Sequence, residues 1–168
     1  KPDAPEYQRE EITFDEAGMA DNLPAFQNKS VSHNKISAWY FKNPTAKYTV
    51  LLHHGQRGNL EHYKETAHCL YDAGASVFLY DYSGYGKSTG RPNNAQVLAD
   101  AQAAGEYINR VLKVPDERLV HAGVSIGTGP CLETAALHKN VPGLILVSPY
   151  QSMESVWRLR LPFFNLYP

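Results

Sequence analysis

The chain has 168 residues, of which 43% are hydrophobic and 20% are charged, and its formal net charge is −1. Acidic and basic residues are interspersed without a basic run, which argues against nucleic acid as a partner. The longest apolar runs, such as residues 144–147, are far shorter than the roughly 20 residues that a membrane span needs. This length favours one domain with its own core, over residues 1–168.

Strand-like and helix-like segments alternate along most of the chain. The sequence predicts strands over residues 11–14, 35–41, 48–52, 75–80, 119–122 and 144–147. It predicts helices over residues 59–71 and 97–112, and a third that starts after the turn at Gly123 and runs to about His138. Such alternation is typical of βαβ units, so we expect an α/β fold whose mostly parallel sheet carries helices on both faces.

The beginning of the chain and its two cysteines leave the compartment open. The chain starts at Lys1 without a leader-like segment, so we expect a processed or trimmed protein. Cys69 and Cys131 are isolated and lack the CxxC spacing of a redox or zinc site. Both are predicted to be small buried residues, and a disulfide between them stays an alternative. The cytoplasm is slightly favoured as the compartment.

The segment Gly123-Val124-Ser125-Ile126-Gly127 matches the pattern Gly-x-Ser-x-Gly between a predicted strand and a predicted helix. In a nucleophile elbow the serine occupies a strained turn from strand to helix, and the flanking glycines prevent clashes there. Ser125 is therefore the candidate nucleophile, and the N–H of Ile126 is a candidate oxyanion donor. The alternative is a strand-to-helix turn without chemistry.

A second match, Gly86-Lys87-Ser88-Thr89-Gly90, lacks this context. Arg91 and Pro92 follow it instead of a helix. A phosphate-binding loop would need a glycine where Asp81 stands. We therefore expect a structural loop at the rim of the site.

His54-Gly55-Gln56 follows the strand at residues 48–52, where a second oxyanion donor would lie, so the N–H of Gln56 is the candidate. Adjacent histidines on a strand point to opposite faces, so His53 and His54 are expected to bond to loop backbone instead of binding one metal ion. No metal or cofactor is predicted. The remaining histidines are expected to be ordinary surface or core residues: His33, His62, His68, His121 and His138.

These motifs stand in an order that resembles the α/β-hydrolase superfamily, and within it the Bem46-like branch of small serine hydrolases. The resemblance covers about residues 50–147 and rests on His54-Gly55, on residues 81–88 and on residues 123–130. It implies that Ser125 is the nucleophile, that Gln56 and Ile126 form the oxyanion hole, and that Asp81 belongs to a structural loop. Val124 departs from the polar residue often found beside the family's serine.

We expect the fold to be incomplete at its C-terminal side, because the acid and histidine of such a triad follow the serine on later strands. No histidine follows His138, which a helix would place about 20 Å from Ser125. The chain alone is therefore expected to be nearly inactive. Three explanations stay open: a portion of a longer hydrolase, a degenerate hydrolase that binds or interacts, or a half completed by a second chain.

The function that these residues predict is hydrolysis of an ester, thioester or amide in a small-molecule or acylated substrate, through an acyl-enzyme on Ser125. The alternative is a catalytically incomplete binding or interaction protein on the same scaffold. A helical spacing of Met153, Val156, Trp157 and Leu159 suggests either a pocket wall or core packing. The apolar ending at residues 161–168 looks like an interruption within a folded region.

Overall fold

A six-stranded sheet forms the centre of this computed structural model, which describes residues 7–20 and 22–150. The strand order is β1-β2-β4-β3-β5-β6. Strands β3, β4, β5 and β6 run parallel, whereas β2 is antiparallel to both β1 and β4. The prediction of a mostly parallel sheet is confirmed. The strands are β1 (Glu10–Asp15), β2 (Lys35–Phe41), β3 (Thr49–His53), β4 (Ser76–Tyr80), β5 (Leu119–Val124) and β6 (Leu144–Val147).

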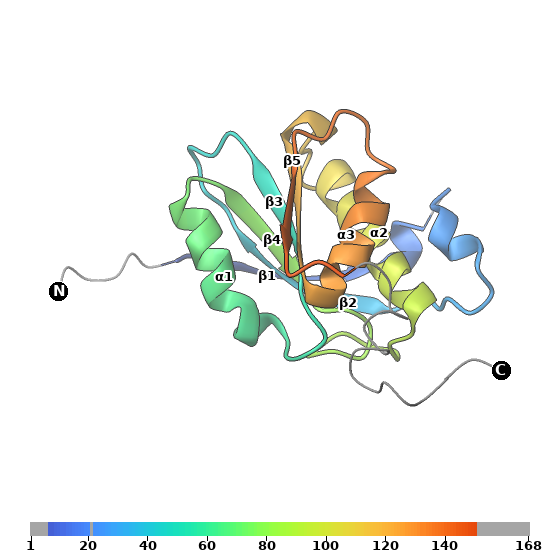
Figure 1. Cartoon of the computed structure of the whole chain (residues 1–168). Helices are drawn as coiled ribbons and strands as arrows, with labels where there is room; N and C mark the ends of the chain where they lie inside the picture. Colours follow the sequence, from blue (N-terminus) through green and yellow to red (C-terminus); the bar gives the residue numbers. More distant parts are fainter. Residues whose placement is uncertain (1–6, 21, 151–168) are drawn as a thin grey trace.

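Helices cover both faces of the sheet, as predicted. Helix α1 (Leu60–Asp72) packs against β2 and β4 on one face, and α2 (Asn94–Arg110) and α3 (Thr128–Ala135) pack on the other (Figure 1). Short 3-10 helices occur at Glu16–Gly18, Pro24–Gln27, Asp116–Arg118 and Ser125–Gly127. No helix in the described part of the chain is long and apolar enough to cross a membrane.

Local signals account for most helix boundaries. The Asn59 and Asn93 side chains cap α1 and α2 by accepting backbone N–H bonds at 3.1 and 2.9 Å, and Gly74 ends α1 with a φ of 95°. Helix α3 ends at Ala135, earlier than predicted. The Asp116 carboxylate bonds the His138 ring at 2.9 Å and the backbone N–H of residue 139 at 2.8 Å, which draws the chain off the helix axis.

Two apolar layers enclose the central strands because side chains of β3 and β4 alternate between faces, and both faces are buried. The layer under α2 contains Leu51, Phe78, Ala101, Ala104 and Ile108. The layer under α1 contains Val50, Leu52, Leu60, Ala67, Val77 and Leu79. The small alanines let α2 approach the sheet closely. This core holds the carboxyl ends of β3, β4 and β5 in fixed positions.

The edge strand β6 carries four apolar side chains that are all exposed, between 36% at Leu146 and 48% at Val147. An exposed edge strand offers unpaired backbone groups for another strand. Pairing with a second chain or a downstream segment therefore stays a prediction. The predictions for residues 153–159 and 161–168 lie outside the described residues.

The two cysteines differ from each other. Both are free, and Cys131 is buried as predicted. The prediction for Cys69 is wrong, because its side chain is exposed. Cys69 lies two residues after the buried Ala67. At about 100° per residue, this places it on the far side of α1 from the core.

Candidate functional site

Ser125 occupies the sharp turn between β5 and α3. Its φ of 53° lies in the left-handed region, which is uncommon for a residue with a side chain. Its side chain is exposed. The Thr128 hydroxyl donates a hydrogen bond of 2.7 Å to the backbone oxygen of Ser125 and so holds the turn. The hydroxyl of Ser125 therefore stands at the carboxyl edge of the sheet, on a backbone that the surrounding packing holds in a strained conformation.

The glycines on both sides of Ser125 are required by close packing. A Cβ atom at Gly123 would lie 2.7 Å from the Cα atom of Thr128. A Cβ atom at Gly127 would collide with the backbone oxygens of His53 and His54 at the end of β3. The elbow therefore presses directly against the loop that follows β3.

That loop carries Gly55 and Gln56 alongside Ser125. A Cβ atom at Gly55 would lie only 3.5 Å from the Cβ atom of Ser125 and 2.6 Å from the Tyr63 hydroxyl. The structure thus brings the segment of Gln56 beside that of Ser125 and Ile126, although they are about 70 residues apart in the sequence. Gln56 is exposed and Ile126 is half-buried. Their roles as oxyanion donors stay predictions.

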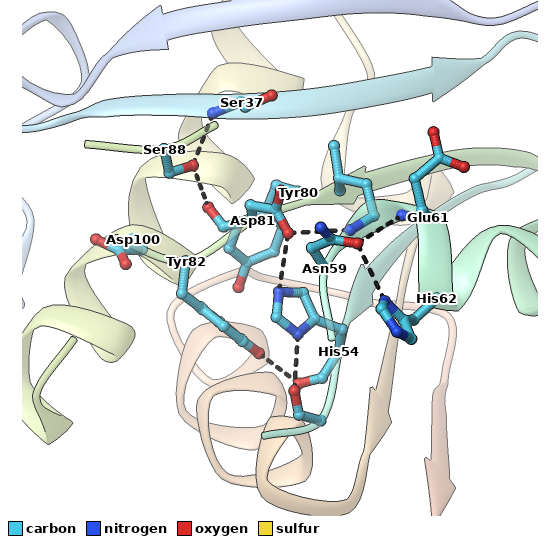
Figure 2. Close-up of polar contacts among 12 residues, drawn as sticks. Ser37, His54, Asn59, Glu61, His62, Tyr80, Asp81, Tyr82, Ser88 and Asp100 are labelled. Carbon is cyan, nitrogen blue, oxygen red and sulfur yellow. Dashed lines mark hydrogen bonds and ion pairs between the residues drawn. The ribbon is translucent and has the colours of Figure 1, made fainter. Parts of the chain in front are cut away.

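The backbone before Gly55 is fixed by buried side chains (Figure 2). The Nδ1 atom of His54 donates to the backbone oxygen of Gly55 at 2.8 Å, and the Tyr82 hydroxyl donates to the backbone oxygen of His54 at 3.0 Å. The Nε2 atom of His54 lies 3.5 Å from Oδ1 of Asp81. Oδ1 of Asp81 also accepts the backbone N–H of Leu60 at 3.0 Å. These contacts join the loops after β3 and β4 to the start of α1.

Ser88, the serine of the second Gly-x-Ser-x-Gly match, is buried in a structural role. Its hydroxyl donates to the backbone oxygen of Asp81 at 2.7 Å and accepts the backbone N–H of Ser37 at 2.9 Å. Gly86 has a φ of 48°, and the Asp81 side chain lies against it. The geometry agrees with the expected structural loop.

Behind this loop lies a buried carboxyl pair that the sequence analysis missed. Asp100 accepts the backbone N–H of Ser83 at 2.6 Å and its hydroxyl at 2.8 Å. Glu16, which is fully buried, accepts the backbone N–H of Asn34 at 2.7 Å, and the Gln96 amide donates to the carboxyls of both Glu16 and Asp100, at 3.3 and 2.9 Å. Burial raises the pKa of both carboxyls, and the Asp100 carboxyl helps to raise that of Glu16 to about 9, so the pair holds one proton at neutral pH.

One histidine lies differently from the prediction. His54 bonds to loop backbone as expected, but His53 instead contacts the Tyr80 hydroxyl at 2.8 Å and Nδ1 of His121 at 3.4 Å. Burial lowers the pKa of His53 well below its ordinary value and that of His121 to about 3, so both are neutral core residues. His138 bonds to Asp116, an acidic partner that lies 22 residues away in the sequence. In the described part of the chain, no histidine hydrogen-bonds to Ser125.

A cavity of about 250 Å³ adjoins the elbow between the first turns of α2 and α3. Tyr150 closes one side, and its hydroxyl lies 3.4 Å from the backbone oxygen of Ile126. Glu133 and Asn94 supply polar groups to the lining. The apolar lining comes from Val97, Leu98, Ile126 and Pro130.

Known proteins resemble this chain in sequence or in fold. An uncharacterized protein of Mycobacterium tuberculosis is 31% identical over 95% of the chain, which covers 59% of that protein. Human alpha/beta hydrolase domain-containing protein 17B is 32% identical over 79% of the chain, which covers 46% of that protein. The chain thus spans roughly half the length of these relatives. An esterase of Pyrococcus furiosus has the same fold, with a TM-score of 0.73 and 18% identity over 96% of this chain and 57% of that one.

A sequence model of a protein family also matches the chain, in agreement with these relatives and with the order of the motifs. The model of the alpha/beta hydrolase fold matches residues 48–167, which include Ser125, the loop after β3 and the loop after β4. The resemblance seen in the sequence is confirmed: the chain belongs to the α/β-hydrolase family.

Proposed function

We propose that this chain carries the nucleophile and oxyanion hole of a serine hydrolase that cleaves an ester, thioester or amide through an acyl-enzyme on Ser125. The observation that carries the proposal is the left-handed backbone of Ser125, with a φ of 53°, at the turn from β5 into α3. Strain of this kind costs on the order of 1–3 kcal/mol and is concentrated at functional sites. The exposed side chain leaves the hydroxyl free to meet a substrate.

In the proposed reaction, Oγ of Ser125 attacks the carbonyl carbon of the substrate and its proton passes to a base. The backbone N–H groups of Gln56 and Ile126 stabilise the oxyanion, and the alcohol, thiol or amine then leaves with a proton. Water hydrolyses the acyl-enzyme in a second step and returns the serine to its free form. The base and its acidic partner would come from outside the described residues, because no histidine within them hydrogen-bonds to Ser125.

The cavity beside Ile126 supports a substrate with an apolar group next to the scissile bond. Its lining includes Val97, Leu98 and Pro130, and Ile126 directly follows the proposed nucleophile. Each buried methylene contributes about 0.8 kcal/mol, so a short alkyl chain would gain appreciable affinity there. The Glu133 carboxylate in the lining disfavours an anionic group.

Labelling with a fluorophosphonate tests the proposal on the full-length protein. The wild type should be labelled, Ser125→Ala should not be, and Ser88→Ala should be labelled like the wild type, because Ser88 has the same local pattern without the elbow. Labelling that persists in Ser125→Ala would contradict the assignment. A full-length protein that is never labelled would favour the binding or interaction role instead.

A further inference from the structure

A buried histidine–aspartate pair lies directly behind the loop of Gly55. The Nε2 atom of His54 is 3.5 Å from Oδ1 of Asp81, and the two side chains are 0% and 3% exposed. Neither residue has a role in the reaction steps proposed above. Because a Cβ atom at Gly55 would lie 3.5 Å from the Cβ atom of Ser125, any movement of the His54 backbone changes the gap between the loop and the nucleophile.

The protons on the His54 ring and the Asp81 carboxyl determine how this pair is held together. The backbone oxygen of Gly55 can only accept, so Nδ1 of His54 carries a proton. In a neutral ring Nε2 is then an acceptor, and it faces a carboxylate, which is also an acceptor. Without a further proton, Nε2 has no hydrogen-bond partner among the described residues. One proton, shared between Nε2 and the carboxyl of Asp81, satisfies both groups and removes the repulsion between them.

We propose that His54 and Asp81 share a single proton and thereby act as positioning residues that hold the Gly55–Gln56 backbone beside Ser125. The inference rests on the proposed function, since it assigns these residues to the oxyanion loop of that reaction. The pair ties the loop after β3 to the loop after β4. The Tyr82 hydroxyl, which donates to the backbone oxygen of His54 at 3.0 Å, supports the same segment from the other side.

The surroundings favour a pair without net charge. Burial raises the pKa of Asp81 to about 6 and lowers the pKa of His54 to about 4, so the charged form of each side chain is disfavoured in this place. Aromatic rings of Tyr63, Tyr82 and Tyr85 enclose the imidazole. The charged groups that line the cavity on the Asp81 side are of both signs, and they are Arg9, Glu11, Glu61 and Lys87.

A loss of the shared proton at higher pH should loosen the loop. Asp81 is half ionised at a pH of about 6, and as the pH rises further the carboxylate and the bare Nε2 atom repel each other. Asp81→Asn keeps the shape of the side chain, and its amide nitrogen, in the place of Oδ1, supplies a permanent N–H donor to Nε2 at the cost of the bond from the Leu60 N–H, which Oδ1 accepts in the wild type. Asp81→Leu fills a similar volume but offers neither donor nor acceptor.

The test compares the fluorophosphonate labelling rates of the full-length wild type, Asp81→Asn, Asp81→Leu and the control Ser88→Ala across pH. The ratio of the Asp81→Asn rate to the wild-type rate should be lowest at about pH 5, where the wild type keeps both the shared proton and the Leu60 bond, and should rise severalfold, up to about tenfold, by about pH 9. Using a ratio cancels the titration of the catalytic base. Asp81→Leu should be slower by about 10- to 100-fold at every pH. Ser88→Ala removes hydrogen bonds to the backbone of Asp81 and Ser37 but leaves the side chains of His54 and Asp81 intact, so it should leave the shape of the wild-type pH profile unchanged.

The outcomes separate the two proposals. An unlabelled wild type refutes the proposed hydrolase, whereas a labelled wild type with a pH-independent ratio refutes the proton pair. Nitrogen-15 spectra of the His54 ring decide the pair even without activity. They should show a protonated Nδ1 atom and a ring whose signals shift with pH in the wild type but not in Asp81→Asn. A neutral ring protonated only at Nε2 would overturn the inference.

Discussion

The buried pair of Glu16 and Asp100 makes the stability of the fold depend on pH, and one substitution should remove this dependence. Burial and the carboxyl of Asp100 raise the pKa of Glu16 from 4.5 to about 9. In the unfolded chain the same glutamate ionises near its ordinary pKa. Between these two values the folded protein binds more protons than the unfolded chain, so its free energy of unfolding falls as the pH rises.

The size of the effect follows from the width of this window. The slope is about 1.4 kcal/mol per pH unit for one proton, so the cost of keeping Glu16 protonated reaches about 3 kcal/mol near pH 7. In Glu16→Gln the side-chain oxygen still accepts the backbone N–H of Asn34, as Glu16 does at 2.7 Å, and the neutral amide beside Asp100 needs no bound proton. We therefore expect Glu16→Gln to stabilise the protein by about 1–3 kcal/mol near pH 7 and by almost nothing near pH 4.

Urea unfolding of the full-length protein at several pH values between about 4 and 9 measures this difference. Glu117→Gln, which neutralises an exposed carboxylate, is the matched control and should shift the stability by less than about 0.5 kcal/mol. If Glu16→Gln destabilises the protein at every pH, or gives a gain that does not grow with pH, the shared proton between Glu16 and Asp100 is wrong.

Two pairs of residues give further predictions from packing alone. Gly123→Ala should destabilise the protein by about 1–3 kcal/mol, because the new methyl group would meet the Cα atom of Thr128 at 2.7 Å, whereas Gly143→Ala, with no atom within 4 Å, should be nearly neutral in thermal unfolding. Iodoacetamide followed by mass spectrometry should modify the exposed Cys69 and spare Cys131, whose pKa burial raises to about 12. Equal modification of both thiols under native conditions would contradict the burial of Cys131.

The fold could be predicted well because its signals are local. Alternating or continuous apolar runs gave the strands, and Asn59, Asn93 and Gly74 mark helix boundaries that depend only on neighbouring residues. The end of α3 could not be predicted in this way. It is set by Asp116, which lies 22 residues before His138 in the sequence and reaches it only in the folded chain.

The candidate site likewise has one part that the local sequence predicts and one part that depends on residues far apart in the sequence. Ser125 was found from a five-residue pattern and the elements beside it, so its position needed no knowledge of distant residues. The partnership of His54 and Asp81 was missed, although a signal existed. In the sheet Leu52 pairs with Leu79 in parallel register, so the residues two positions beyond them, His54 and Asp81, emerge side by side at the carboxyl edge. Only the strand order, which the sequence does not state, makes these two strands neighbours.

The His54–Asp81 pair and the Glu16–Asp100 pair both contact one short segment, residues 81–83. Substitutions in the two pairs are therefore not expected to have independent effects. Asp81, at the start of this segment, lies against His54, and Ser83, two residues later, donates a hydrogen bond to Asp100. Each pair keeps a proton that higher pH removes, so both ends of the segment lose support in the same direction. Contacts that share a segment this short are expected to couple. We therefore expect the double variant Glu16→Gln/Asp81→Asn to be less sensitive to alkaline pH, in stability and in labelling rate, than either single variant. The reduction in sensitivity should differ from the sum of the reductions in the two single variants.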